Sequence, residues 1–396
     1  MSAVLEALQA RADEFVALRR DIHRHPELAF EEFRTSDLVA ERLAQWGYAV
    51  ERGLGGTGVV GQLRRGTGSK RLGLRADMDA LPIAEATGLA HASTRPGVMH
   101  ACGHDGHTAM LLAAAHHLAT QGRFDGTLNL IFQPAEEGQG GARKMMEDGL
   151  FAKYPCDAIF AMHNMPGHPQ GRLLLRDGAA MASSDHVTIT LEGTGGHGAM
   201  PHRAADPVVA GSAIVMGLQS IVARNIDPLH MAVITVGAFH AGAANNVIAQ
   251  SATLKLSVRA LDSGVRDTLE RRITELAQGQ AQSLGVTARV DYQRSYPVLV
   301  NTPAETEFAR RVALELVGAD RVELQARALT GSEDFAFMLE QVPGSYLLIG
   351  NGDGTADGVN DGHGACMVHN PGYDFNDRNL PIGAAYWALL AQRFLA

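Results

Sequence analysis

The sequence predicts an α/β protein in which a larger domain, built on a mixed and largely parallel sheet, carries an inserted α+β domain. The 396 residues are too many for one ordinary hydrophobic core. Strand-like and helical segments alternate in the first part of the chain, as they do around parallel sheets. A later segment has the order β-α-β-β-α-β, which is that of a ferredoxin-like sandwich. We therefore assign residues 1–182 and 296–396 to the larger domain and residues 183–295 to the insertion.

The larger domain is expected to begin with two helices. Apolar residues recur at helical spacing from Val4 to His23, and Pro26 ends that segment. A second helix runs from Ser36 to Trp46. The alternating part then comprises strands at 58–63 and 72–79, a helix at 108–120, a strand at 127–132, a helix at 142–150 and a strand at 158–162. Functional side chains of such sheets gather where the strands end.

The inserted domain starts where the alternating pattern changes, around residues 181–184. Asp206 and Pro207 mark the start of its first helix, as cap and first helical residue. Its elements are a strand at 186–191, a glycine-rich loop at 193–202, a helix at 206–224, strands at 232–239 and 252–260, a helix at 265–283 and a strand at 286–292. From about Pro297 the chain returns with two helices, and residues 350–364, rich in Gly and Asp, are predicted to form a surface loop.

Composition limits the classes of function. Apolar residues make up 46% and charged residues 19% of the chain, which is typical of a soluble globular protein. The net charge of −9, from 34 basic and 43 acidic residues, argues against nucleic acid and anionic membranes as partners. We find neither a run of about 18 apolar residues nor a signal-peptide pattern. The three cysteines form no disulfide framework, so a cytoplasmic location is expected.

The stretch Met99–Thr108 is the main candidate for a functional site. It holds Cys102, His104 and two further histidines on glycine-flanked backbone. Thiolate and neutral imidazole are ligands that borderline-soft divalent metals prefer. Taken alone, the stretch is also compatible with a helix N-terminus capped by Asp105.

Two adjacent carboxylates, Glu136 and Glu137, follow the strand at 127–132. Neighbouring side chains on extended backbone point in opposite directions, so one carboxylate could bind a metal while the other faces a different partner. A metal-activated water needs a general base, and a nearby carboxylate is suitable. The alternative is a pair of solvated charges.

His163 ends the strand at 158–162, and His369 precedes an Asn-Pro-Gly turn. Either histidine, taken alone, is more often a hydrogen-bonded structural residue than a ligand. Five side chains together offer a mixed donor set: Cys102, His104, Glu137, His163 and His369. That number suits two ions that share a bridging ligand better than one closed tetrahedral site.

These motifs resemble those of the two-metal aminoacylase/carboxypeptidase family. The similarity is closest to the branch of hippurate hydrolases, N-acyl-amino-acid amidohydrolases and indole-acetyl-amino-acid hydrolases. It runs nearly from end to end, through His23–Glu27, Arg75–Pro82, Met99–Thr108, Phe132–Gly138, Gly193–His202, Ser332–Phe335 and His369–Asp377. The resemblance implies a zinc-exopeptidase-like catalytic domain with an inserted ferredoxin-like lid and dimerisation domain.

The resemblance also implies how the ligands are shared. Cys102 would bridge two divalent ions, at a position where most of the wider family has aspartate. His104 and His163 would complete one metal site, and Glu137 and His369 the other. The ions would be Zn, Mn, Co or Ni, since thiolate with imidazole tolerates all of them.

Further roles follow from the same resemblance. Glu136 would act as the general base, and His197 of the inserted domain would help to hold the oxyanion. Asn246 and Arg259 would be candidates for binding the substrate carboxylate, which fits a guanidinium fork. Arg259 is equally compatible with a surface charge on a strand.

The chain departs from the wider pattern at two places. Other branches have His-x-Asp where this chain has Asp77-Met-Asp79, and we expect Asp79 to orient a ligand rather than to bind metal. Members often have proline where this chain has Ala249.

The sequence therefore predicts a metal-dependent amidohydrolase that cleaves small N-acyl-L-amino acids. A dipeptidase or an N-carbamoyl-amino-acid hydrolase could use the same centre, and a metal-binding or redox-sensing protein could use Cys102 as a switch thiol. Glu136 argues against a sensor, which needs no base facing the metal. In the family that this chain resembles, the smaller domains pair edge to edge, so we expect a homodimer that supplies His197 to the neighbouring subunit.

Overall fold

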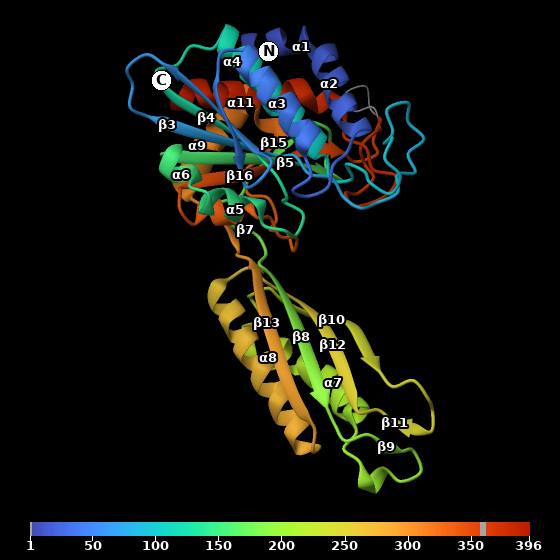
Figure 1. Ribbon diagram of the computed structural model, residues 1–396. Coiled ribbons are helices and arrows are strands. Elements are labelled where there is room, and N and C mark those ends of the chain that lie inside the picture. Colours follow the sequence, from blue (N-terminus) through green and yellow to red (C-terminus); the bar gives the residue numbers. More distant parts are fainter. Residues whose placement is uncertain (1, 357–361) are drawn as a thin grey trace. The chain divides into compact units, whose positions relative to one another are not determined.

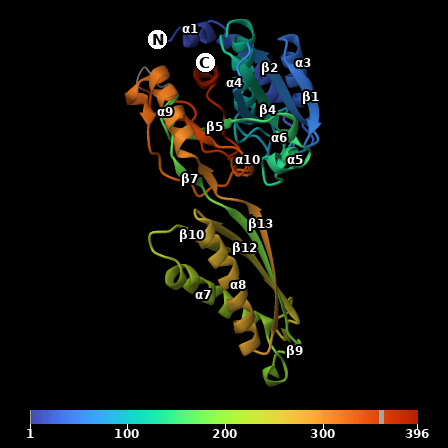
Figure 2. The same cartoon turned by 90° about the vertical axis from the view of Figure 1, so that its left-hand side faces the viewer.

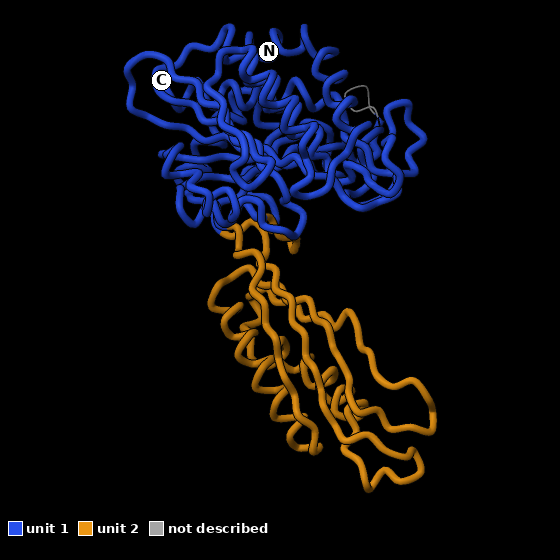
Figure 3. The backbone as a smooth tube through the Cα atoms, viewed as in Figure 1, with its two compact units in different colours: residues 1–178, 300–327, 334–396 blue, residues 179–299, 328–333 orange. Residues whose placement is uncertain are grey.

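The computed structural model describes residues 2–356 and 362–396 (Figures 1 and 2). The chain divides into two compact units, coloured separately in Figure 3. Unit 1 contains residues 1–178, 300–327 and 334–396, and unit 2 contains residues 179–299 and 328–333.

Unit 1 is built on an eight-stranded mixed sheet with the strand order β1-β2-β4-β3-β5-β16-β6-β15. Strand β3 is parallel to β4 and β5, and β16 is parallel to β5, whereas β1 and β2 run antiparallel at one edge. The strands are β1 Ala49–Leu54, β2 Gly58–Arg65, β3 Arg71–Asp77, β4 Gly126–Gln133, β5 Ala158–Pro166, β6 Leu173–Leu174, β15 Val322–Glu323 and β16 Gly344–Gly352. The predicted fold class is confirmed, and the parallel strands at its centre bring their carboxyl ends to one edge.

The helices of unit 1 are α1 Ala3–Gln9, α2 Ala12–Arg24, α3 Phe33–Gln45, α4 His104–Thr120, α5 Gly141–Glu147, α6 Leu150–Lys153, α9 Pro303–Val317, α10 Phe335–Leu339 and α11 Leu380–Phe394. Helix α4 packs against α11, α2 and β3, and nearly all of its residues are buried. Its Ala- and Leu-rich sequence allows this close packing on all sides. The first turn of α4 is thereby fixed in the interior of unit 1.

The structure corrects two expectations for unit 1 and adds one strand that was not predicted. The first predicted helix is two helices, because Arg11 leaves helical geometry and the acidic Asp13 and Glu14 favour a new N-terminus. Strand β1 was not predicted, since it is a largely exposed edge strand without alternation. The predicted loop at 350–364 begins inside buried strand β16: a Cβ on Gly350 would lie 2.1 Å from the Pro169 carbonyl oxygen, so glycine is needed there. Residues 357–361 of that loop lie outside the described residues.

Unit 2 contains a four-stranded antiparallel sheet in the order β10-β12-β8-β13, with α7 and α8 packed on one hydrophobic core. This is the predicted ferredoxin-like arrangement. Its main elements are β8 Ser184–Glu192, α7 Pro207–Asn225, β10 Ala232–Ala241, β12 Ser251–Ala260, α8 Ser263–Ser283 and β13 Thr287–Tyr296. Short strands β9 Gly196–His197 and β11 Val247–Ile248 also belong to unit 2. The short strands β7 Gly178–Met181 and β14 Leu299–Asn301 each include residues of both units.

Helix α7 is long and apolar enough to cross a membrane by length and composition alone, and a third of it is buried. The sequence did not predict such a segment. Helix α7 packs against α8, β10 and β12, as a core helix of the sandwich does.

Candidate metal centre

Gly103 forms the turn that separates Cys102 from helix α4. Its φ of 89° lies in the left-handed region, and a Cβ there would lie 2.3 Å from Asn164 Nδ2 and 2.4 Å from the Tyr373 hydroxyl. Only glycine tolerates both constraints. The turn holds Cys102 and His104 in the interior beside the end of β5.

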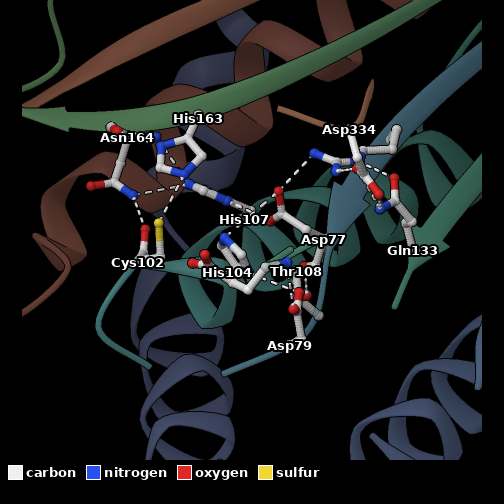
Figure 4. A network of polar contacts seen from close by, with 12 residues as sticks. Asp77, Asp79, Cys102, His104, His107, Thr108, Gln133, His163, Asn164 and Asp334 are labelled. Carbon is white, nitrogen blue, oxygen red and sulfur yellow. Dashed lines mark hydrogen bonds and ion pairs between the residues drawn. The ribbon is translucent and has the colours of Figure 1, made fainter. Parts of the chain in front are cut away.

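Cys102, His104 and His163 form a first group whose potential ligand atoms all lie within 4.8 Å of one another (Figure 4). Cys102 Sγ lies 3.3 Å from His163 Nε2. His163 Nδ1 lies 2.6 Å from the Asn164 carbonyl oxygen, which accepts its hydrogen and leaves a lone pair on Nε2. His104 Nδ1 lies 3.2 Å from Asp79 Oδ1, and its buried Nε2 has no hydrogen-bond partner among the described residues.

Cys102, Glu137 and His369 form a second group that meets the same 4.8 Å limit. Glu137 Oε1 lies 3.2 Å from His369 Nε2. His369 adopts a φ of 63°, which a residue other than glycine rarely does unless its surroundings hold it. The five predicted ligands thus gather in two groups of three that share the sulfur of Cys102.

The charges around these donors favour a cation. Burial, together with Glu137 and Glu136, raises the pKa of the Cys102 thiol well above its ordinary value. Burial alone would lower the pKa of His104, but Asp77 and Asp79 raise it to about 10. A buried thiol among carboxylates becomes a thiolate only beside a positive charge, and a divalent ion supplies it. The donor set and the His104 Nε2 atom, which has no hydrogen-bond partner among the described residues, therefore fit divalent metal ions.

Asp79 holds both groups together. Besides its contact with His104, its Oδ2 accepts a hydrogen bond of 2.9 Å from the backbone N–H of Glu137. One carboxylate therefore orients an imidazole of the first group and the backbone of a ligand in the second. This agrees with the orienting role that the sequence predicted for Asp79.

His107 belongs to neither of these two groups, although one of its ring nitrogens lies within 4.8 Å of ligand atoms of Asp77 and His104. Its Nδ1 lies 2.7 Å from Asp77 Oδ1, and its Nε2 accepts a hydrogen bond of 2.9 Å from the backbone N–H of Asn164. Both ring nitrogens are therefore engaged. The Asn164 side chain donates in turn to the Cys102 carbonyl at 2.7 Å and accepts from the Tyr373 hydroxyl at 2.8 Å. The sequence analysis missed these supporting residues.

Arg75 connects two of the sequence motifs, Arg75–Pro82 and Ser332–Phe335, through buried hydrogen bonds. The buried guanidinium donates to Asp77 at 2.7 Å, to Gln133 at 2.8 Å and to Asp334 at 3.1 Å. It joins β3, the end of β4 and the segment before α10. The end of β4 is thereby fixed just ahead of Glu136.

A second buried cation joins the N-terminal helices to the loop of His369. Arg19 forms ion pairs with Asp374 at 2.9 Å, with Asp377 at 2.7 Å and with Asp105 at 3.3 Å. His23 Nδ1 lies 2.8 Å from Asp105. Burial lowers the pKa of His23, but Asp105 raises it to about 9.

The remaining predicted site residues belong to unit 2. His197 is exposed in β9, and its Nδ1 accepts from the backbone N–H of Ala199 at 3.0 Å, which leaves Nε2 to carry the proton. Asn246 is exposed just before β11. Arg259 in β12 is half-buried, donates to Ser332 Oγ at 2.9 Å and forms no ion pair with any described residue.

The mixed α/β sheet, the two groups of candidate ligands that share the sulfur of Cys102, and the further carboxylate beside them are features of a dinuclear metalloenzyme of the hydrolase type. Glu136 is that carboxylate: it lies within 4.8 Å of ligand atoms of His104 and Glu137 and is 7% exposed.

The chain belongs to peptidase family M20/M25/M40, whose model matches residues 73–393. This confirms the family resemblance of the sequence. The hippurate hydrolase of Campylobacter jejuni is 46% identical over 395 residues, which cover 100% of both chains. The IAA-amino acid hydrolase ILR1-like 5 of Arabidopsis thaliana is 39% identical and covers 97% of this chain and 87% of its own. The crystal structure of Bacillus subtilis YXEP, described as a dinuclear metal binding peptidase, is 31% identical, with a TM-score of 0.83 over 98% of this chain and 99% of that chain.

Proposed function

We propose that this protein is a metal-dependent amidohydrolase that cleaves the amide bond of N-acyl-L-amino acids and uses two divalent ions per subunit. The observation that carries the proposal is the pair of ligand groups joined by Cys102, with Glu136 beside them. The names of the related hippurate hydrolase and IAA-amino acid hydrolase support this substrate class, because both substrates are amides of amino acids.

Cys102, His104 and His163 would hold one ion, and Cys102, Glu137 and His369 the other. When bound, the ions supply Lewis acidity that polarises the substrate carbonyl and acidifies the attacking water. The mixture of thiolate, imidazole and carboxylate suits Zn, Mn, Co or Ni.

Glu136 performs the proton transfers. Its carboxylate takes a proton from the attacking water and then donates it to the amide nitrogen, so that the amine can leave. Burial beside the ligands keeps bulk water from competing for that proton.

Unit 2 supplies the groups that recognise substrate. His197 Nε2–H stabilises the oxyanion that forms on the carbonyl oxygen when water attacks the carbonyl carbon. Arg259, with Asn246, binds the free carboxylate of the substrate, and its lack of an ion-pair partner among the described residues leaves the guanidinium available. Residues 183–295 would then form a lid that closes over residues 1–182 and 296–396.

We further propose a homodimer formed through unit 2. The exposed face of α7 includes Val209 and Met216, which are 54% and 74% exposed, and the helix carries no charge before Arg224. Edge strand β10 contains no Asp, Glu, Lys or Arg among its ten residues, whereas the opposite edge β13 carries arginine and aspartate. Long edges without such charged side chains are normally paired or covered. Such a dimer would bring His197 to the partner subunit's site.

A cytoplasmic location completes the proposal. The three cysteines, all within the described residues, form no disulfide.

Hydrolysis of a substrate panel tests the proposal. The purified protein is stripped with a chelator, reloaded with Zn, Mn, Co or Ni and given benzoyl-, acetyl- and indole-acetyl-amino acids, dipeptides and carbamoyl-amino acids. We expect metal-dependent cleavage of the acyl-amino acids. If the protein preferred dipeptides or carbamoyl compounds, these would replace N-acyl-amino acids as its substrate class. A lack of hydrolysis with every ion would refute the proposal that the protein is a hydrolase.

A further inference from the structure

The carboxylate of Glu32 contacts two strained segments of backbone. It lies at the N-terminus of α3, is fully buried and belongs to none of the ligand groups. Its Oε1 accepts hydrogen bonds from the backbone N–H of Phe30 at 3.0 Å and of Ala135 at 2.9 Å, and its Oε2 accepts from the Thr57 hydroxyl. Phe30 and Ala135 adopt φ values of 63° and 53°, in the left-handed region.

Left-handed backbone is unusual for residues other than glycine. Among the described residues only three such residues have positive φ, and the third is the candidate ligand His369. A side chain disfavours this geometry, so surrounding contacts must hold it in place. Glu32 Oε1 is the contact shared by two of the three positions.

Of these three residues, Ala135 matters most for the metal centre, because Glu136 and Glu137 follow it directly in the chain. Its carbonyl accepts a hydrogen bond of 2.9 Å from the backbone N–H of Gly141, so both of its backbone polar groups are hydrogen-bonded. Asp79 then holds the N–H of Glu137. If Ala135 relaxed to negative φ, the direction of the chain into both carboxylates would change.

We propose that Glu32 is a positioning residue that holds Ala135 in the left-handed conformation and thereby directs Glu136 and Glu137 toward the metal centre. Glu32 acts through the backbone and touches neither substrate nor metal. The catalytic part of this inference rests on the proposed function, whereas the part that concerns metal affinity does not.

Three variants distinguish the effect of losing the Glu32 hydrogen bond from the effect of a general loss of stability. Glu32→Ala removes the acceptor. Glu32→Gln keeps an oxygen in the Oε1 position, and its amide N–H can donate to the Thr57 hydroxyl. In the double variant Glu32→Ala with Ala135→Gly, the glycine adopts positive φ without help. Glu31→Ala is the matched control, since it removes an exposed neighbouring carboxylate.

Metal affinity is measured first, by titrating each metal-free variant with Co²⁺ under competition from a chelator. We expect Glu32→Ala to bind at least one of its two ions about 10–100 times more weakly than the wild type, the usual effect of removing a group that orients ligands. Glu32→Gln and Glu31→Ala should stay within a few-fold of the wild type. The double variant should recover most of the affinity, although Ala→Gly normally lowers stability.

Kinetics on benzoylglycine provide the second measurement. Glu32→Ala should lower kcat with little change in KM, and the double variant should restore kcat. Any one of three results would overturn the proposal. Glu32→Ala could fold and keep the metal affinity and kcat of the wild type, or Glu32→Gln could be as impaired as Glu32→Ala. The double variant could also fold without recovering metal affinity or kcat. If Glu32→Ala cannot be purified, Glu32→Leu replaces it in both backgrounds, because leucine fills the space without an acceptor. If the wild type hydrolyses no N-acyl amino acid, the proposed function fails while the Co²⁺ titration still decides the role of Glu32.

Discussion

The division of labour between two adjacent carboxylates gives the sharpest mutational prediction. Glu136→Gln keeps the size of the side chain but replaces one carboxylate oxygen with an amide nitrogen, which removes its ability to take a proton. Glu136 is 7% exposed, within 4.8 Å of ligand atoms of His104 and Glu137. A positioned general base contributes about 10²–10⁴-fold to the rate. We therefore expect kcat to fall by about that factor, equivalent to about 3–5 kcal/mol of activation free energy.

Glu137→Gln should behave differently. Its carboxylate belongs to the group of Cys102 and His369, so its loss should weaken metal binding by about 10-fold or more. The assay is steady-state hydrolysis of benzoylglycine alongside elemental analysis of each purified variant. We expect Glu136→Gln to retain two ions and lose activity, and Glu137→Gln to lose metal. If Glu136→Gln lost metal while Glu137→Gln kept it, the two roles would be reversed: Glu136 would be the metal ligand and Glu137 the general base.

Three further predictions concern stability and assembly. Arg19→Met leaves three carboxylates without their buried cation and should lower the free energy of unfolding by about 3–5 kcal/mol in urea titrations; a change below 1 kcal/mol would contradict this. Because the pKa of His23 is raised from 6.5 to about 9, its charged form stabilises the fold at neutral pH, and this contribution should be lost as pH rises through about 9. His23→Gln should flatten that part of the plot of unfolding free energy against pH. An unchanged plot would show that His23 does not cause this pH dependence. Mixing inactive Glu136→Gln and His197→Ala subunits should restore activity in heterodimers; verified heterodimers that remain inactive would show that the site is not shared.

Local patterns in the sequence predicted much of the fold. Alternating strands and helices placed Glu136, Glu137 and His163 at or near strand ends. In the structure the two glutamates follow the end of β4 at Gln133, and His163 lies inside β5, near its end at Pro166. The β-α-β-β-α-β order predicted the sandwich of unit 2. The predictions were wrong where tertiary packing decides, as at Gly350, whose glycine serves a buried strand rather than a loop.

The supporting residues could not be predicted for a related reason. His104 and His107 lie in one motif, and only the contacts of His107 with Asp77 and Asn164 distinguish a supporting histidine from a candidate ligand. Tyr373 and Asn164 are 209 positions apart in the chain. No local periodicity encodes such pairings, since they depend on which strand ends meet.

The central claim is that Cys102 joins two metal sites. Titrating the metal-free protein with Co²⁺ while recording the thiolate-to-cobalt charge-transfer absorption tests it most directly. We predict two Co²⁺ ions per chain and a thiolate band that Cys102→Ser abolishes and that Cys366→Ser and Cys156→Ser leave unchanged. Binding of a single ion, or a thiolate band that survives Cys102→Ser, would contradict the claim.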